Sequence, residues 1–317
     1  MNRIKNALKV IIALILTIIL MAPASLGLSE LQVFADDSTS YEGGTLQVSR
    51  SEGSVEITAV PNAGYDLCNV YYTKDGEDIY IDMSEWASSG SGYTITIEDS
   101  AAENTVKARF LNNSVWDGCL DVSWYSKSSS VMYISTPAQL AGLAAIVNGL
   151  YNTEITRDMI KGDISAIAVT EEEHESAAYY GMNMSTNVYH YGADNFNGKT
   201  VYLTRSVDMG GIYDSSSGTW TGEHNYMPIG GEYLIDIYDR KTKLSSSFNG
   251  TFDGQGFTVA NIYCERYNPG ANYGDGSSVG LFGRIGVHDN DPVSLRAYQP
   301  TVRNVIVTGY ISARRSV

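Results

Sequence analysis

The fold is predicted from a stretch that reads Phe248-Asn249-Gly250-Thr251-Phe252-Asp253-Gly254-Gln255-Gly256-Phe257-Thr258-Val259-Ala260-Asn261-Ile262-Tyr263-Cys264. A second phrase, Thr301-Val302-Arg303-Asn304-Val305-Ile306-Val307, repeats the pattern that runs from Thr258 to Cys264. Both begin with Thr-Val, continue with any residue and then Asn, and go on with an aliphatic residue. Such repetition indicates a supersecondary unit that buries its apolar face by stacking on the next copy. The repeat predicts a β-solenoid, and the alternative is an ordinary sandwich of short strands.

Each phrase is predicted to form a short strand, because β-branched residues are dense and glycine or aspartate lies at the ends. Asn261 and Asn304 interrupt these apolar strands. Asparagine tolerates the left-handed backbone conformation and imitates turns. We therefore expect both residues to turn the chain and to bond to one another or to the backbone.

The segment between the two phrases contains Gly280-Leu281-Phe282-Gly283. Together with the phrases around it, this segment resembles the GLUG-motif repeats of secreted bacterial surface proteins and of some Gram-positive proteases. Related phrases occur earlier, at Trp116-Asp117-Gly118, Asp121 to Tyr125, Ala138 to Leu143, Gly198 to Leu203 and Met227 to Gly230. The resemblance implies a right-handed parallel β-helix over residues 116–317, with an insert at about residues 150–194 that fits no strand repeat.

A helix is predicted over residues 137–148. Thr136 is suited to cap it, Pro137 fits its first turn and Gly149 ends it. Its apolar stripe is formed by Leu140, Leu143, Ala144 and Val147. A helix of this kind covers the open end of a solenoid. Within the insert, Thr156 to Ile167 is also predicted to be helical.

Residues 1–35 are predicted to be an export signal. Basic residues up to Lys9 precede an apolar run from Val10 to Met21, and Val33-Phe34-Ala35 then offers a cleavage site. The uncharged segment is long enough to span a bilayer, so an uncleaved membrane anchor is the alternative. Residues 36–40 are polar and are predicted to be disordered.

Residues 41–111 are predicted to form a small β domain. Strands are expected at Thr45 to Ser49, Ser54 to Ala59, Cys68 to Tyr72, Tyr93 to Ile97 and Thr105 to Phe110, with a hairpin turn at Asp75-Gly76. The segments from Ile57 to Tyr65 and from Asn104 to Phe110 resemble the divergent B-repeat of listerial internalins and other Gram-positive surface proteins. That resemblance implies a spacer or adhesion module without catalytic activity.

Charge and cysteine content exclude several classes of function. The chain has 36 acidic and 21 basic residues, a net charge of −15, which argues against binding to nucleic acid. Cys68, Cys119 and Cys264 are odd in number and have no Cys-x-x-Cys spacing. We therefore expect no disulfide framework and no thiolate metal site. Cys264 is expected to be a small buried residue within a strand.

Catalytic motifs are weak. In His174-Glu175-Ser176-Ala177-Ala178, an alanine stands where a zinc-protease motif needs its second histidine, so that site is absent. Asp208 and Asp253 are candidate carboxylates for a polysaccharide lyase or hydrolase, but a turn role is favoured for Asp253. Calcium has only weak candidates in Asp289 and Asp291, which lack the spacing of an EF-hand. No cofactor is expected.

Aromatic side chains in turn-rich stretches are the candidate binding residues. They are Trp220, Tyr226, Tyr233, Tyr238, Tyr267 and Tyr273. Such rings stack on sugars or anchor a protein partner, and the alternative is that they pack loops over the solenoid wall.

These observations predict an exported, secreted or cell-surface protein without catalytic activity. Its expected role is adhesion or spacing, with an extracellular glycan or protein as ligand and the cell wall as a site of association. The competing hypotheses are a carbohydrate-active enzyme on a β-helix and the non-catalytic front part of a larger surface protease. Because the sequence stops at Val317, directly after a repeat strand, we expect a longer natural protein.

Overall fold

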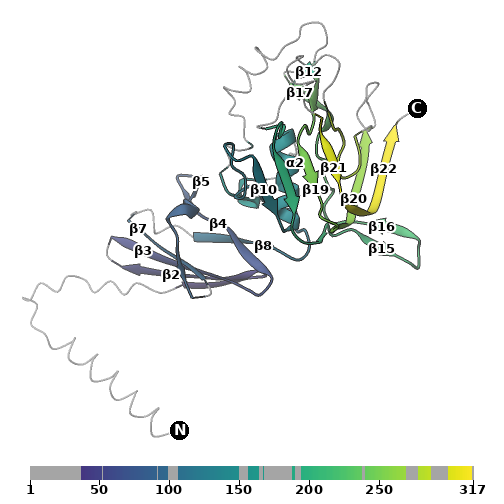
Figure 1. Cartoon of the computed structure of the whole chain (residues 1–317). Coiled ribbons are helices and arrows are strands. Elements are labelled where there is room, and N and C mark those ends of the chain that lie inside the picture. The colour runs from purple at the N-terminus through teal and green to yellow at the C-terminus, as the bar shows by residue number, and fades with distance from the viewer. Residues whose placement is uncertain are drawn as a thin grey trace, which may run out of the picture. The chain divides into compact units, whose positions relative to one another are not determined.

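The computed structural model describes residues 37–51, 53–90, 92–98, 106–149, 156–163, 167, 188–189, 194–237, 240–268, 278–286 and 299–315. Contacts divide the chain into Met1–Ala35 and Asp36–Val317. The first unit, which coincides with the predicted export signal, lies outside the described residues. The described part is mostly β-structure, with one α-helix, α2 (Pro137–Asn148) (Figure 1). Within it, no helix has the length and apolar character needed to cross a membrane.

Residues 37–112, here called the antiparallel region, form two sheets around one core. The strands are β1 (Asp37–Tyr41), β2 (Gly44–Ser51), β3 (Ser54–Pro61), β4 (Tyr65–Lys74), β5 (Glu77–Tyr80), β6 (Ala87–Ser89), β7 (Gly92–Ile97) and β8 (Val106–Asn112), and η1 (Met83–Glu85) is a 3-10 turn. One sheet has the order β1-β2-β3-β7-β6 and the other the order β5-β4-β8. Their alternating apolar side chains, among them Leu46, Ile57 and Val70, form the core between them.

The local sequence signals of this region are confirmed. All five predicted strands are present, and Asp75 and Gly76 both have positive φ, 53° and 89°, as a tight hairpin requires. The prediction of disorder over residues 36–40 is wrong for the described residues, because β1 pairs antiparallel with β2. Backbone pairing on an edge strand needs no apolar side chains, and Arg50 anchors the strand through an ion pair with Asp37 at 2.6 Å.

Residues 115–315, here called the parallel region, are built on short parallel strands. These are β9 (Leu120–Asp121), β10 (Val131–Ile134), β11 (Ile160–Lys161), β13 (Thr200–Leu203), β14 (Val207–Asp208), β19 (Thr251–Asp253), β20 (Thr258–Asn268), β21 (Thr301–Arg303) and β22 (Ile306–Arg315). The first parallel sheet has the order β10-β13-β19-β21, the second the order β14-β20-β22, and β9 pairs with β11. Figure 1 shows β20 and β22 running side by side.

Two antiparallel hairpins leave this framework. One joins β15 (Ile212–Asp214) to β16 (Thr219–Thr221) and protrudes from the strands around it (Figure 1). The other joins β17 (Gly231–Ile237) to β18 (Arg240–Ser246), and β12 (Val188–Tyr189) pairs parallel with β18.

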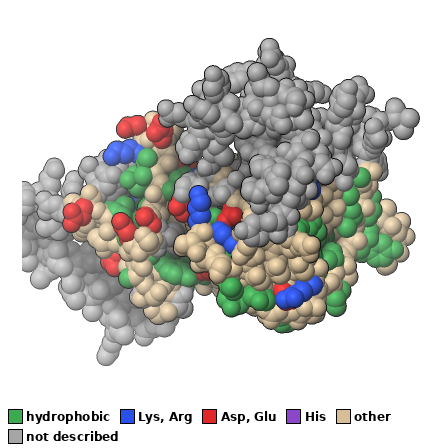
Figure 2. Space-filling view, turned by 45° about the horizontal axis from the view of Figure 1, so that its top comes forward, with side chains coloured by type: hydrophobic (Ala, Val, Ile, Leu, Met, Phe, Trp, Pro, Cys, Tyr) green, Lys and Arg blue, Asp and Glu red, His purple; other side chains and the backbone are tan. Residues whose placement is uncertain are grey.

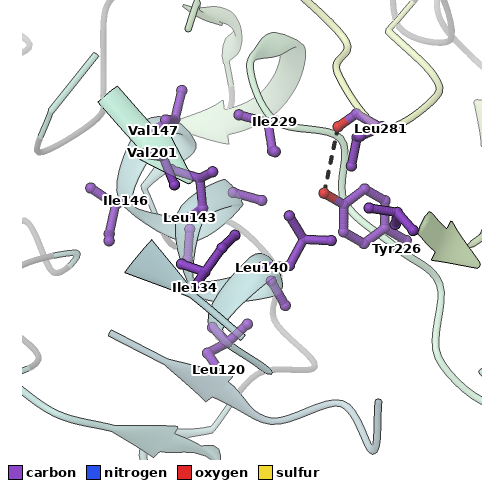
Figure 3. Packing of buried hydrophobic residues seen from close by; sticks show 14 of the residues in the cluster. Leu120, Ile134, Leu140, Leu143, Ile146, Val147, Val201, Tyr226, Ile229 and Leu281 are labelled. Carbon is purple, nitrogen blue, oxygen red and sulfur yellow. Dashed lines mark hydrogen bonds between the residues drawn. The ribbon is translucent and has the colours of Figure 1, made fainter. Parts of the chain in front are cut away.

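The first parallel sheet alternates between a buried and an outer face. Val201, Phe252 and Val302 lie opposite one another in register and face the core, where Val201 and Phe252 are fully buried. The next residue of each strand lies on the opposite face, as the two-residue period of a strand requires, and of these Asp253 is nevertheless buried. The core continues through Leu120, Ile134, Leu140 and Leu143 (Figure 3).

The repeated phrases stack differently from the prediction. Thr301 of the second phrase lies opposite Thr251, and the strand that lies on Thr258 begins at Ile306. The two matching phrases therefore lie in different sheets, that of β20 in the second parallel sheet and that of β21 in the first. Their likeness marks the same local geometry, a Thr-Val strand segment that ends at an asparagine with positive φ.

The two asparagines do share that geometry. Asn261 and Asn304 have φ of 56° and 54°, so the expected left-handed conformation is confirmed. Their side-chain partners, however, are carboxylates. Asn261 donates to both oxygens of Asp208 at 3.1 Å, and Asn304 donates to Oδ1 of Asp253 at 3.1 Å. Each turn is thereby bonded to an aspartate that lies about 50 residues earlier in the chain.

Helix α2 begins and ends as predicted. Thr136 Oγ1 accepts the hydrogen bond of Gln139 N at 3.2 Å, and Gly149 follows the last turn with a φ of 75°. The buried surface of the helix is larger than the single apolar stripe that was expected, because every residue except Gln139 is buried. Small residues make this enclosure sterically feasible: a Cβ at Gly142 would lie 2.1 Å from the backbone oxygen of Asp121.

The helix prediction over residues 156–167 is wrong within the described residues. Arg157–Met159 forms a 3-10 turn, η3, and Ile160 then starts β11. The reason is a parallel pairing with β9, in which Lys161 lies opposite Asp121. This part of the predicted insert therefore contributes a strand to the framework.

Candidate binding surfaces

The outer face of the first parallel sheet carries an outer column, defined as Tyr133, Tyr202, Asp253 and Arg303, one residue from each strand in register. The rings of Tyr133 and Tyr202 stack with centroids 5.6 Å apart and planes inclined by 21°. Because β10 is the first strand of the sheet order, Tyr133 has a stacking partner on one side only among the described residues, and its side chain is 60% exposed.

A shallow hollow of about 790 Å³, here called the groove, lies next to this column. It is lined by Tyr202, Asp253, Gln255, Gly256, Asn304, Val305 and Ile306. Its size falls within the range of small-molecule sites, roughly 300–1,000 Å³. The groove therefore joins an aromatic ring to amide and charged side chains within one hollow.

The Asp253 carboxylate is held by three donors. Oδ1 accepts from the backbone N–H of Gln255 at 3.0 Å and from Asn304 at 3.1 Å, and Oδ2 accepts from Nε of Arg303 at 3.0 Å. The Gln255 bond, followed by those of Asn304 and Arg303, lowers the pKa of Asp253 below its ordinary value. A carboxylate held ionised in this way is unsuited to act as a general acid.

Asp208, the other candidate carboxylate, also has a structural role. It accepts from Gly210 N at 2.9 Å and from the Asn261 amide. Both aspartates thus hold turns of the parallel region, as was favoured for Asp253.

The candidate aromatic residues differ in their exposure to solvent. Trp220 lies on the protruding hairpin, partly exposed, and packs against Tyr213 with centroids 5.5 Å apart. Tyr226 was expected to be an exposed loop residue, and this is wrong: its side chain is 2% exposed. The hydroxyl of Tyr226 donates to the carbonyl of Leu281 at 3.5 Å within the core (Figure 3). For Tyr226 the alternative hypothesis therefore holds, because the ring packs in the interior of the protein.

The remaining candidates cannot be placed by their side chains. The backbones of Tyr233 and Tyr267 lie in β17 and β20, but their side chains are outside the description. Tyr238 and Tyr273, with the weak calcium candidates Asp289 and Asp291, lie outside the described residues.

Sequence reasoning missed the outer column. A signal was present, because Val131-Met132-Tyr133-Ile134 and Thr200-Val201-Tyr202-Leu203 place a tyrosine at the same position of an alternating strand. Recognising it requires knowing that these two strands are neighbours, which their distance in the chain conceals. The same arrangement occurs on the second parallel sheet, where Tyr263 and Tyr310 stack at 5.8 Å.

A second hollow, here called the junction pocket, lies between the antiparallel and parallel regions and has a volume of about 580 Å³. Its lining combines aromatic rings, among them Tyr65, Tyr71 and Trp116, with the acidic residues Glu42, Asp117, Asp158 and Glu223. Asp117 is engaged by the backbone N–H groups of Asn112 and Cys119, and Asp158 lies 3.8 Å from Arg109.

One face of the molecule shows little concentrated charge (Figure 2). On the face in Figure 2, basic side chains lie beside acidic ones and most of the described surface is uncharged. Among the described residues, no group of three His, Cys, Asp or Glu side chains is arranged to hold a metal ion. Comparisons with protein-family models, with curated proteins and with solved structures found no match.

Proposed function

We propose that this chain is an exported, non-catalytic binding protein that holds an extracellular glycan on the outer column and in the groove. The parallel region is proposed to be a β-solenoid of the kind implied by the resemblance to GLUG-motif repeats. The parallel pairings along β10-β13-β19-β21 and along β14-β20-β22, which join successive parts of the chain, support this arrangement. The predicted signal at residues 1–35 supports export to the medium or the cell surface.

The observation that carries the glycan proposal is the Tyr133–Tyr202 stack beside the groove, in which Tyr133 is exposed and Tyr202 is partly buried. Aromatic rings on a rigid sheet provide flat apolar surface at little cost in side-chain entropy. The apolar face of a sugar ring is complementary to such a surface. Tyr133 offers a ring on the outer side of the stack, so a chain of sugars could continue from there along the column.

The polar side chains of the groove suit hydroxyl groups. The side chains of Gln255 and Asn304 supply amide donors and acceptors, and Arg303, whose side chain is 55% exposed, supplies N–H donors. Arg303 is paired with Asp253, so the two formal charges cancel. This balance favours a neutral polysaccharide over a strongly charged one.

Replacing Tyr133 or Tyr202 with alanine is expected to weaken glycan binding by about tenfold or more, the equivalent of losing one stacking contact of about 1.4 kcal/mol. The probe is an array of neutral, acidic and amino-sugar oligosaccharides, followed by calorimetric titration with the best-bound neutral oligosaccharide. Tyr310→Ala provides the matched control, because it removes a stacked tyrosine from the second parallel sheet. It should reduce stability to a similar extent and leave binding unchanged.

Two results would contradict the proposal. The first is an array on which no oligosaccharide is retained above background. The second is binding that the Tyr133 and Tyr202 variants leave intact, or that Tyr310→Ala weakens equally.

The enzyme hypothesis now depends on the junction pocket, which contains Glu42 and Glu223 as well as the engaged carboxylates. We expect no cleavage when the chain is incubated with the polysaccharides that it binds, as measured by the release of reducing ends and of unsaturated sugars. Cleavage that is lost in Glu42→Gln or Glu223→Gln would instead establish a lyase or hydrolase.

A further inference from the structure

Two of the three cysteines meet in the interior. Cys68 and Cys119 are both fully buried and belong to one small cluster with Leu111 and Ala138. The Cys68 thiol itself lies 3.6 Å from the carbonyl oxygen of Asp158, and Cys119 is close enough to raise the pKa of Cys68. Cys264 lies elsewhere, in the core of the parallel region, where β20 places it opposite Ile311.

A bulge in β4 directs Cys68 toward its partner. Opposite β8, the register shifts between Leu67 and Asn69, so Cys68 is the extra residue. Leu67 and Val70 consequently both face the core of the antiparallel region. Cys68 and Asn69 face the parallel region instead, where Asn69 donates to the backbone oxygens of Asp158 and Ile160 at 2.8 and 3.1 Å.

The backbone of Cys119 is held at both polar groups. Its N–H donates to Oδ1 of Asp117 at 3.1 Å, and its carbonyl accepts from Nε1 of Trp116 at 2.8 Å. The sulfur of Cys119 accepts a hydrogen bond from Nε of Arg109 at 3.3 Å. Both thiols are thus carried by backbone whose position is fixed, and both belong to the one small cluster at the boundary between the two regions.

We propose that Cys68 and Cys119 form a disulfide bond that links the antiparallel region to the parallel region when the chain folds in an oxidising compartment. The setting rests on the proposed export, because structural disulfides persist outside the reducing cytosol. The positions of the two cysteines in the fold do not depend on export. The odd cysteine count concealed the pair, since it argues against a complete framework but not against one bridge with one thiol left over.

Thiol–disulfide exchange with a small disulfide such as oxidised glutathione balances the reaction. One cysteine thiolate attacks the glutathione disulfide and forms a mixed disulfide, which releases one glutathione thiolate. The second cysteine thiolate then attacks the protein sulfur of that mixed disulfide, the Cys68–Cys119 bond forms, and a second glutathione leaves. The protein loses two electrons and two protons, and one glutathione disulfide becomes two thiols.

Burial determines when this exchange occurs. The interaction with Cys119 and burial raise the pKa of the Cys68 thiol well above its ordinary value, so little of the reactive thiolate exists in the folded chain. Neither sulfur is accessible to an external disulfide once the chain has folded. The bond is therefore formed during folding.

The test counts free thiols. The full chain is unfolded, reduced, and refolded with reduced and oxidised glutathione. Recovery of the native fold is checked by circular dichroism, and the chain is then unfolded in guanidinium chloride at neutral pH and alkylated at once with excess N-ethylmaleimide. Intact mass should show one alkyl group, on Cys264, and three after reduction. Cys264→Ser is the matched control and should take up none before reduction, whereas Cys68→Ser should lose the bridge.

A refolded, unreduced chain that takes up three alkyl groups would overturn the proposal, as would a linked peptide that contains Cys264. If the chain does not refold, the same alkylation is made on chain purified from an oxidising compartment, with the same two outcomes. Reduction should also lower the midpoint of thermal unfolding by roughly 5–10 °C in the native sequence and leave the midpoint of Cys68→Ser unchanged. Glycan binding does not enter these readouts, so failure of the binding proposal leaves this one intact.

Discussion

Replacing Phe252 with alanine is expected to lower the free energy of unfolding by about 3–5 kcal/mol, the range measured when large buried aromatic residues are truncated. Phe252 is fully buried, between Val201 on one neighbouring strand and Val302 on the other. Its ring meets that of Phe282 edge to face, with centroids 5.4 Å apart. Removing the ring leaves a cavity between stacked layers, which the rigid strands cannot close.

The measurement is urea denaturation, followed by circular dichroism. Thr251→Ala is the matched control, because the preceding residue lies on the other face of the same strand, and it should cost less than about 1 kcal/mol. Phe252→Leu should lie between the two. If Phe252→Ala costs no more than Thr251→Ala, the inward-facing column does not form the core of the parallel region.

Local features of the fold could be predicted from the sequence because they depend on neighbours in the chain. Thr136, Pro137 and Gly149 specify where α2 begins and ends without reference to any other segment. Asp75-Gly76 specifies a hairpin in the same way. These positions carry their own conformational preferences, so the pattern and the structure agree.

The features of the structure that differ from the predictions depend on partners that are distant in the chain. Residues 37–40 have little propensity to form a strand by themselves, and β2 supplies the pairing. The pairing of Thr301 with Thr251, rather than with Thr258, depends on which strands become neighbours in space. Tyr226 lies in a loop by sequence but is enclosed because the Leu281 segment packs over it.

The candidate site was hidden for the same reason. Tyr133 and Tyr202 form a surface only because β10 pairs with β13 across the predicted insert. The carboxylates Asp208 and Asp253, which are the more conspicuous residues for chemistry, proved to be partners of turn asparagines. Residue type alone indicates what chemistry is available, whereas the long-range pairing decides which groups are free for a ligand.

The second large effect is expected at the boundary between the two regions, where Lys161→Met should lower the free energy of unfolding by about 3 kcal/mol. Lys161 forms a half-buried ion pair with Asp66 and lies opposite Asp121 in the parallel pairing of β11 with β9. Asp66 also accepts from Leu67 N and from the Tyr93 hydroxyl, both at 2.8 Å. Removing the ammonium leaves two carboxylates without their cation, and methionine restores only the volume.

A double-mutant cycle with Asp66→Asn isolates the pair, because the variant with both changes should lose less stability than the sum of the two single variants. Urea denaturation of the four proteins measures this difference. A loss below about 1 kcal/mol for Lys161→Met, with additive single effects, would instead place the pair among ordinary surface ion pairs.

The pH dependence gives an independent check on the same pair. Burial acts to raise the pKa of Asp66, but the charge and hydrogen bond of Lys161 outweigh it, so the pKa lies below its ordinary value of 3.8. The stabilisation is therefore present above pH 3.8 and is lost as the pH falls through the lower pKa of the folded state.

For Lys161, burial acts to lower the pKa, but the charge of Asp121 and the contact with Asp66 raise it above 10.5. That contribution is present below pH 10.5 and is lost as the pH rises through the higher pKa of the folded state. The difference in unfolding free energy between the native chain and Lys161→Met should thus be constant between these limits and shrink beyond either. In Asp66→Asn, the part of the stability loss at low pH that comes from Asp66 should be absent, because an amide has no proton to take up. A difference that stays constant below pH 3.8 in the native chain would mean that the carboxylate of Asp66 is not what holds Lys161 in place.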